Sequence, residues 1–111
     1  MAVIDRVSAS GTAVIANGAT TSGEISAENM AGGSFQIPSA FSGASVSFTG
    51  TNESGGTFVA IHDSTNTVVS QTVTASKAYA FPATVMQFRF FKIVSASAEG
   101  AARSIPYTLK G

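Results

Sequence analysis

One histidine and six carboxylates are the residues of this chain whose side chains could carry acid–base chemistry. His62 directly precedes Asp63, and adjacent side chains in a strand point to opposite faces, so the two cannot act as a base and its orienting carboxylate. The pair is more typical of a histidine at a strand end beside an aspartate that stabilises an Asx turn. We therefore expect no catalytic residues, and a protein that is not an enzyme.

Metal and cofactor sites are equally poorly supported by the residue types. The chain has no cysteine and no tryptophan. A single imidazole with scattered carboxylates does not supply the ligands that zinc prefers, and the segment Asp63–Asn66 lacks the glycine and distal glutamate of a calcium loop. Tyr79 and Tyr107 are the remaining candidates for stacking on a sugar, and either can simply lie at a strand end with its hydroxyl in water. We expect no metal and no cofactor.

The charge balance bears on possible partners. Six basic and six acidic residues cancel, and only 11% of the residues are charged, against roughly 25% in ordinary soluble domains. This removes the basic surface expected of a nucleic-acid or anionic-membrane binder. No apolar run approaches the roughly 18 residues of a membrane span, and the first residues do not resemble a signal peptide. A surface that repels its copies weakly favours a homo-oligomer, with a soluble monomer rich in Ser and Thr as the alternative.

The most apolar stretch is Gln87–Ser95, which holds three of the eight phenylalanines. As a strand it would direct Phe88 and Phe90 to one face and Phe91 to the other. A strand that is apolar on both faces lies inside a sheet that is covered on both sides, or at a sheet junction that also meets a partner subunit. We therefore predict a central strand here, with Phe48 and Phe88 among the most buried side chains.

The rest of the chain reads as short strands separated by turns. About eight strands recur at roughly the 8–12-residue spacing of sandwiches and barrels, without an amphipathic helix. The predicted class is all-β, an antiparallel β-sandwich of jelly-roll type, favoured over a closed barrel because enough aromatic side chains are present to fill the space between two sheets. These side chains are Phe35, Phe48, Phe58, Phe88 and Phe90. Pro106 predicts that the last strand, Arg103–Leu109, is an edge strand or contains a bulge.

Residues 19–111 are predicted to form the sandwich domain, and residues 1–18 an N-terminal arm or an edge strand. The first segment is only loosely apolar, with the small-residue stretch Ser8–Gly11 as a hinge. An arm of this kind can lie on a neighbouring subunit, and a frayed end is the plainer alternative. The candidate anchors of the interaction arm are Val3, Ile4, Val7, Val14 and Ile15.

Several short motifs occur in the order found in a known group of proteins. They are Gly23-Glu-Ile-Ser, Phe35-Gln-Ile-Pro-Ser-Ala-Phe41, Val46-Ser-Phe-Thr, Gly55-Gly-Thr-Phe58, a turn at Asp63 and Arg89-Phe-Phe-Lys-Ile-Val-Ser95. In these motifs the chain resembles small β-sandwich structural proteins from the virions of tailed bacteriophages. The resemblance covers roughly residues 19–111, and it lies in the order of the motifs because each one alone is also an ordinary strand or turn.

The resemblance implies a capsid decoration, or cement, protein. Such a protein would be synthesised in the host cytoplasm and would bind the major capsid protein on the outer surface of the virion. The resemblance further implies a homo-oligomer, and specifically a homotrimer on local three-fold axes. Because a fold does not fix a function, a ligand-binding or glycan-binding β module of a phage tail or fibre is the alternative.

Overall fold

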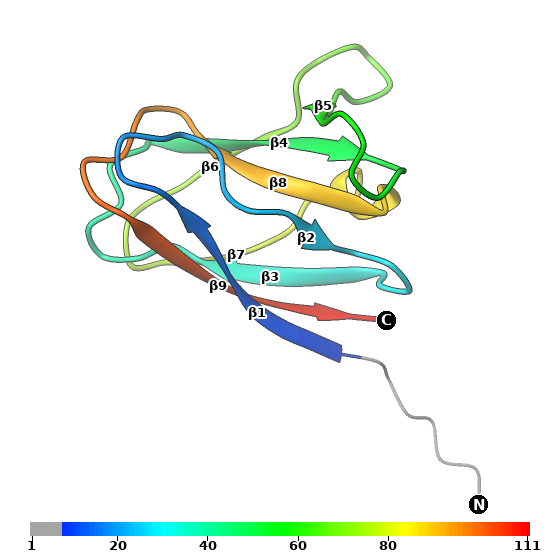
Figure 1. The fold of residues 1–111 in the computed structure, drawn as a ribbon, viewed down its shortest axis with the longest axis horizontal. Coiled ribbons are helices and arrows are strands. Elements are labelled where there is room, and N and C mark those ends of the chain that lie inside the picture. Colours follow the sequence, from blue (N-terminus) through cyan, green and yellow to red (C-terminus); the bar gives the residue numbers. More distant parts are fainter. Residues whose placement is uncertain (1–7) are drawn as a thin grey trace, which may run out of the picture.

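A computed structural model describes residues 8–111 as two antiparallel sheets packed face to face, which form the two layers visible in Figure 1. The first sheet contains β1 (Ser8–Ile15), β9 (Arg103–Lys110), β3 (Gly32–Gln36) and β7 (Ala78–Ala80), in that order. The second contains β2 (Ile25–Ser26), β8 (Phe90–Ser95), β4 (Ser45–Thr51) and β5 (Val59–Ala60), with β6 (Ser70–Thr72) also paired to β4. Within the described residues the only helical element is a single 3-10 turn, η1 (Val85–Gln87). The predicted all-β sandwich is confirmed.

The strand pairing has the nested order of a jelly roll. β1 pairs with β9, β2 with β8, β3 with β7, and β4 with both β5 and β6. The chain is thus one long antiparallel hairpin wound into two sheets, which is the jelly-roll arrangement. The described part contains nine strands where the sequence predicted about eight. The additional strand is β1, whose inward positions include the small residues Ala9, Gly11 and Ala13, so that its apolar alternation is weak.

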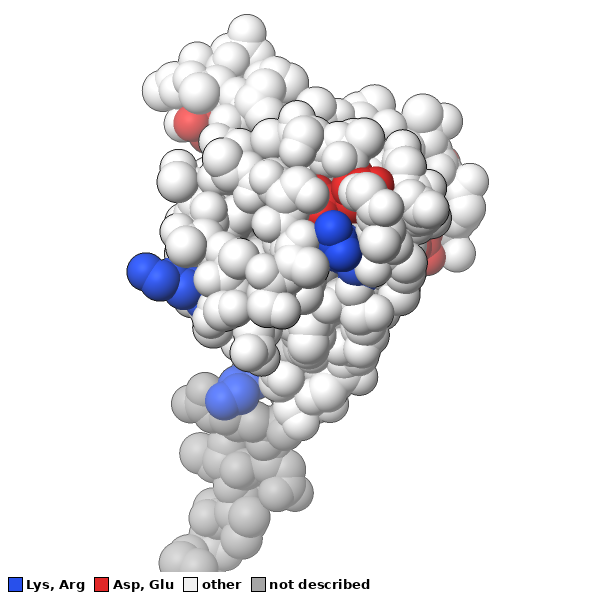
Figure 2. All heavy atoms as spheres, turned by 90° about the vertical axis from the view of Figure 1, so that its left-hand side faces the viewer, with Lys and Arg blue, Asp and Glu red and all other residues white. Residues whose placement is uncertain are grey.

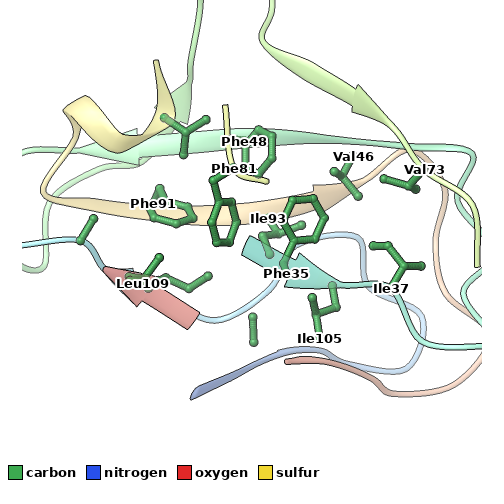
Figure 3. Packing of buried hydrophobic residues seen from close by; sticks show 14 of the residues in the cluster. Phe35, Ile37, Val46, Phe48, Val73, Phe81, Phe91, Ile93, Ile105 and Leu109 are labelled. Carbon is green, nitrogen blue, oxygen red and sulfur yellow. The ribbon is translucent and has the colours of Figure 1, made fainter. Parts of the chain in front are cut away.

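The space between the sheets is filled by aromatic and branched side chains (Figure 3). Phe81 lies between the sheets, with its ring centroid 4.8 Å from that of Phe35 and 5.1 Å from that of Phe91. Phe48 meets three of these rings edge to face and is 0% exposed. Its predicted burial is confirmed.

The phase of the central strand differs from the prediction. The η1 turn occupies Val85–Gln87, so the strand begins only at Phe90. Phe91 is the aromatic residue of β8 that points into the core, whereas Phe90 is buried outside the core cluster. Phe88 is half-buried and packs at the margin of the core beside Gly50. The prediction that Phe88 is among the most buried residues is therefore wrong.

Two further expectations need correction, one about the core and one about the position of β9 in its sheet. Phe58 does not fill the space between the sheets: it is half-buried, and the Nζ atom of Lys92 lies 4.3 Å from its ring centroid. Strand β9 is not an edge strand but lies between β1 and β3. Pro106 is tolerated inside the sheet because the pairing of β3 with β9 ends at the pair Phe35 and Tyr107, one residue before the proline would have to donate.

Candidate interaction surface

The outward side of the first sheet is almost free of charge. Side chains alternate along each strand, so every second residue points away from the core. The outward residues, which together we call the first-sheet face, are Ser8, Ser10, Thr12, Val14, Gly32, Ser34, Gln36, Ala78, Ala80, Ser104, Pro106, Thr108 and Lys110. Lys110 is the one charged member of this set. Figure 2, which looks onto one end of the sandwich, shows the same scarcity of charge.

A shallow hollow of about 290 Å³ lies on the first-sheet face. Strands β1, β3, β7 and β9 all contribute to it, and its polar groups include the side chains of Ser10, Ser34 and Gln36. The ring of Phe35 lies in the core. The Tyr107 ring is on the inner side of the sheet, because its hydroxyl lies 2.6 Å from where a Cβ atom on Gly11 would be, and position 11 points inward like Ala13 and Ile15. The hollow thus offers hydroxyl and amide groups without an aromatic ring on which a sugar could stack.

The second feature of this surface is the open edge of β1. One side of β1 pairs with β9 along its whole length, from Ser8 opposite Lys110 to Ile15 opposite Arg103. Within residues 8–111, its other side is met only near its end, by the bridge of Ile15 to Ser22 and by the Gly23 N–H that donates to the Val14 carbonyl at 3.2 Å.

The direction of the backbone groups along this edge follows from strand geometry. In an antiparallel ladder the N–H and C=O of one residue point to the same side, and successive residues alternate. Because the Val14 carbonyl faces the open edge, Ser8, Ser10 and Thr12 present their N–H and C=O groups there too. Pro106 supports this assignment, since it stands opposite Thr12 and has no N–H to donate to it.

The other sheet edges of the described chain are protected and β1 is not. Strand β7 has only the residues Ala78–Ala80, and it is bounded by Lys77 and closely followed by Pro82. Strands β2 and β5 are two residues long and β6 is three. Short length, lysine and proline are the usual devices that prevent an edge from pairing with another chain. Ser8–Ile15 is eight residues long and contains neither a charge nor a proline.

The structure separates the predicted arm residues into three groups. Val3, Ile4 and Val7 lie outside the described residues. Val14 is on the first-sheet face and is 46% exposed, so it remains available for contacts. Ile15 is 0% exposed and belongs to the core of its own chain. Residues 8–15 are thus an edge strand of the sandwich.

A buried carboxylate at one end of the sandwich was missed in the sequence. The Glu99 side chain is 0% exposed and forms an ion pair with Arg103, whose Nε donates to Oε1 at 3.0 Å. The Ser42 N–H also donates to Oε1 at 2.9 Å, and the Ser95 hydroxyl donates to Oε2 at 3.0 Å. Burial acts to raise the pKa of Glu99, but these hydrogen bonds together outweigh it, so the pKa lies below its usual range.

Glu99 joins loops that are far apart in the sequence, since its backbone N–H also donates to Ala19 and its carbonyl accepts from Gly18. All of its interactions are internal, so its role is to hold the end of the sandwich together. One sequence signal could have found it: it is the only acidic residue in the small-residue loop 96–102, four positions before Arg103.

His62 and Asp63 lie in an exposed turn. The His62 Nδ1 atom is 3.1 Å from the Ala60 carbonyl oxygen. Asp63 Oδ1 accepts the Thr65 hydroxyl at 2.7 Å and the N–H groups of Thr65 and Thr67 at 2.9 and 3.0 Å. The Thr65 hydroxyl, followed by these N–H groups, lowers the pKa of Asp63. Asp63 Oδ1 is thus occupied in stabilising the turn.

Two further kinds of site are absent from residues 8–111. No three or more His, Cys, Asp or Glu side chains come together there in a way that could hold a metal ion. No helix in that part of the chain has the length and apolar character required to cross a membrane.

The fold and this surface define a small jelly-roll domain with a nearly uncharged sheet face and one open edge. Among solved structures, the chain is similar to the crystal structure of the SPBc2 prophage-derived protein YomS, with a TM-score of 0.67. The alignment covers 100% of this chain and 99% of that chain at 12% sequence identity. At this identity the similarity shows a common fold. No family model and no curated protein matches the chain.

Proposed function

We propose that this chain is a non-enzymatic structural protein of a phage virion, which acts as a capsid decoration protein. It binds the major capsid protein on the outer surface of the head as a homo-oligomer and stabilises the head. The observation that carries this proposal is the first-sheet face, a broad sheet surface with Lys110 as its single charge. The resemblance of the ordered motifs to those of phage virion proteins gives it further support, as does the prophage origin of YomS, which has a similar fold.

The physical basis is the low cost of covering such a face. Burying an unpaired charge in an interface is expensive, whereas hydroxyl and small apolar groups can be covered at little cost when their hydrogen bonds are replaced. Protein interfaces are depleted of charge in their buried centres. Ser34 lies near the middle of this surface, between Thr108 on β9 and Ala80 on β7. A partner surface of matching shape would therefore bind most tightly around Ser34.

The second candidate function is a glycan-binding module of a phage tail or fibre. The hollow on the first-sheet face favours it, because hydroxyl and amide groups are the usual partners of sugar hydroxyls. The lack of an aromatic ring in the hollow weighs against it, since apolar stacking supplies much of the affinity at sugar sites. We therefore favour the capsid decoration protein over the glycan-binding module.

The test uses purified particles of the phage that encodes the chain. The protein is added to particles that lack it, and the bound copies are counted by quantitative mass spectrometry. Decoration predicts a copy number comparable to that of the major capsid protein. A few copies per particle would support the tail or fibre module instead, and the absence of specific binding would overturn both.

A pair of variants locates the binding surface. Ser34→Arg places a charge in the middle of the first-sheet face and should weaken particle binding by at least about tenfold. Ser70→Arg, on the exposed part of β6 in the second sheet, is the matched control and should bind normally. Equal binding by both variants would show that the first-sheet face is not the contact surface.

A further inference from the structure

The open edge of β1 identifies a specific mode of self-association. We propose that β1 is a docking strand for a second copy of this chain, so that two copies pair antiparallel through Ser8–Thr12 about a two-fold axis at Ser10. The inference goes beyond the proposed function, because it rests on the backbone geometry of β1 and not on capsid binding. It gives the proposed homo-oligomer a defined interface.

The backbone supplies the attraction. Ser8, Ser10 and Thr12 direct their N–H and C=O groups to the open edge, where within the described chain nothing pairs with them. Two such edges that meet antiparallel would exchange about six hydrogen bonds, two for each facing pair of residues. Strand addition to an exposed edge is a recurrent way for proteins to bind extended segments.

The register is fixed by the occupied end of the strand. The Val14 carbonyl already accepts the Gly23 N–H, so a second copy cannot pair with Val14. Centring the pair on Ser10 places Ser10 opposite Ser10 of the second copy and Ser8 opposite Thr12. A centre one residue further along would place Ser8 opposite Val14, which is blocked. Within Ser8–Ile15, the register at Ser10 uses every open position and none of the occupied ones.

The side chains allow the two edges to approach. On the first-sheet face the facing residues are all Ser or Thr, and the Ser10 hydroxyl is already held 3.1 Å from that of Thr108. On the inner side the facing residues are Ala9 and Gly11, which are too small to obstruct the pair. No residue of Ser8–Ile15 carries a charge, so the two copies do not repel each other at the contact.

The choice of a second copy follows from the symmetry of this contact. An isologous pair requires one surface that complements itself, and a short antiparallel strand of small residues meets this condition. A ring would require β1 of one copy to pair with a different edge of the next. The opposite edge of the first sheet is β7, with only Ala78–Ala80 between Lys77 and the nearby Pro82. A two-fold pair is therefore favoured over the homotrimer that the resemblance implies.

Pairing at β1 would also enlarge the proposed binding surface. A two-fold axis perpendicular to the sheet joins the two first sheets into one and keeps both first-sheet faces on the same side. A partner with a repeating surface could then bind both faces at once, and linked binding of this kind raises the apparent affinity without new contacts.

The test measures the oligomeric state of the full chain by analytical ultracentrifugation from about 10 to 500 μM, the range in which weak interfaces are populated. Ser10→Pro removes the N–H that faces the open edge, and proline is tolerated in an edge strand when its missing N–H would face solvent. Ser10→Ala keeps this N–H and is the matched control. We expect a dimer for the unchanged chain and for Ser10→Ala. For Ser10→Pro we expect the dissociation constant of the dimer to be at least about tenfold higher.

Hydrogen exchange gives a second readout at single residues. The amides of Ser10 and Thr12 should exchange more slowly as the concentration of the unchanged protein rises, whereas the Gly11 amide, which faces β9, should be protected at every concentration. This readout does not depend on the folding of the Ser10→Pro variant. Protection that does not change with concentration at Ser10 and Thr12 would overturn the proposal.

Three outcomes of the sedimentation experiment would also overturn it: a monomer throughout the range, a trimer, or an undiminished dimer with a folded Ser10→Pro variant. Each leaves the proposed binding to the capsid standing, because particle binding is measured separately, although a monomer would remove the homo-oligomer from that proposal. Conversely, a β1 dimer that does not bind particles would refute the proposed function and leave this inference intact.

Discussion

Pro106 stands directly opposite Thr12 in the ladder between β1 and β9. A proline inside a sheet would normally break a hydrogen bond, but here its nitrogen faces β3, whose pairing with β9 has ended one residue earlier. The same geometry turns the N–H and C=O of Thr12 to the open edge of β1. One residue thus marks both the end of β3 pairing and the orientation of the open edge.

Substitutions at two neighbouring residues of β1 test whether this segment is a strand of the sandwich or a mobile arm. Ile15→Ala should cost about 2–5 kcal/mol of unfolding free energy, because the Ile15 side chain is 0% exposed in the core. Val14→Ala, one position away and 46% exposed, should change it by no more than about 0.5 kcal/mol. Urea denaturation measures both. Similar small effects for the two variants would mean that β1 detaches readily from the sandwich.

The corrected phase of β8 can be tested in the same way. Phe91→Ala should cost about 3–5 kcal/mol, since Phe91 is 0% exposed and packs against Phe48 and Phe81. Phe88→Ala should cost clearly less, because Phe88 is only half-buried at the margin of the core. A larger loss for Phe88 in thermal or urea unfolding would contradict this phase.

The adjacent glycines at the start of β3 should differ sharply. A Cβ atom on Gly33 would clash with the Thr108 carbonyl oxygen, so the backbone of β9 would have to move. Gly33→Ala should therefore destabilise the protein by about 1–3 kcal/mol. A Cβ atom on Gly32 meets nothing within 4 Å, and Gly32→Ala should be nearly neutral. Urea unfolding curves of the two variants make the comparison, and equal losses would exclude the clash as the cause.

Glu99 should be important for stability although it is not part of the proposed interface. Glu99→Gln removes the charge that faces Arg103 and disturbs the hydrogen bonds from Ser42 and Ser95, at a cost of about 1–3 kcal/mol. Glu53→Gln is the control, because Glu53 is exposed in a turn. Thermal unfolding at neutral pH compares the two, and a loss for Glu53→Gln as large as that for Glu99→Gln would point to a general charge effect.

The stabilisation by Glu99 should depend on pH with a definite sign. Its pKa in the folded protein lies below its ordinary value of 4.5. A carboxyl group of this kind stabilises the fold fully above its ordinary pKa, and this contribution is lost as the pH falls through the lower folded value. The stability difference between the unchanged protein and Glu99→Gln should be constant above about pH 5.5 and shrink below pH 4.5. Urea titrations across this range measure the difference. A difference that grows as the pH falls would show that folding raises the pKa of Glu99 and does not lower it.

The amino-acid sequence by itself determined the fold class and the approximate positions of most strands along the chain. Alternating segments such as Ser45–Thr51 are recognisable because one face of each strand is apolar and the other is polar. The same local pattern correctly identified Phe48 as a core residue. The scarcity of charge, which underlies the proposed interaction surface, is likewise a property of composition alone.

Only the tertiary structure decided the phase of β8, the position of β9 and the role of β1. In a stretch that is apolar on both faces, alternation cannot tell the inner side from the outer, so the sequence alone could not show that Phe91, and not Phe88, points into the core. Pro106 indicated an edge because a proline lacks a donor, but the side to which its nitrogen points depends on which strands flank it. Glu99 became visible as a structural residue only when loops from distant parts of the chain met around it. These are long-range relationships, and a local pattern contains no information about which partners a residue will meet.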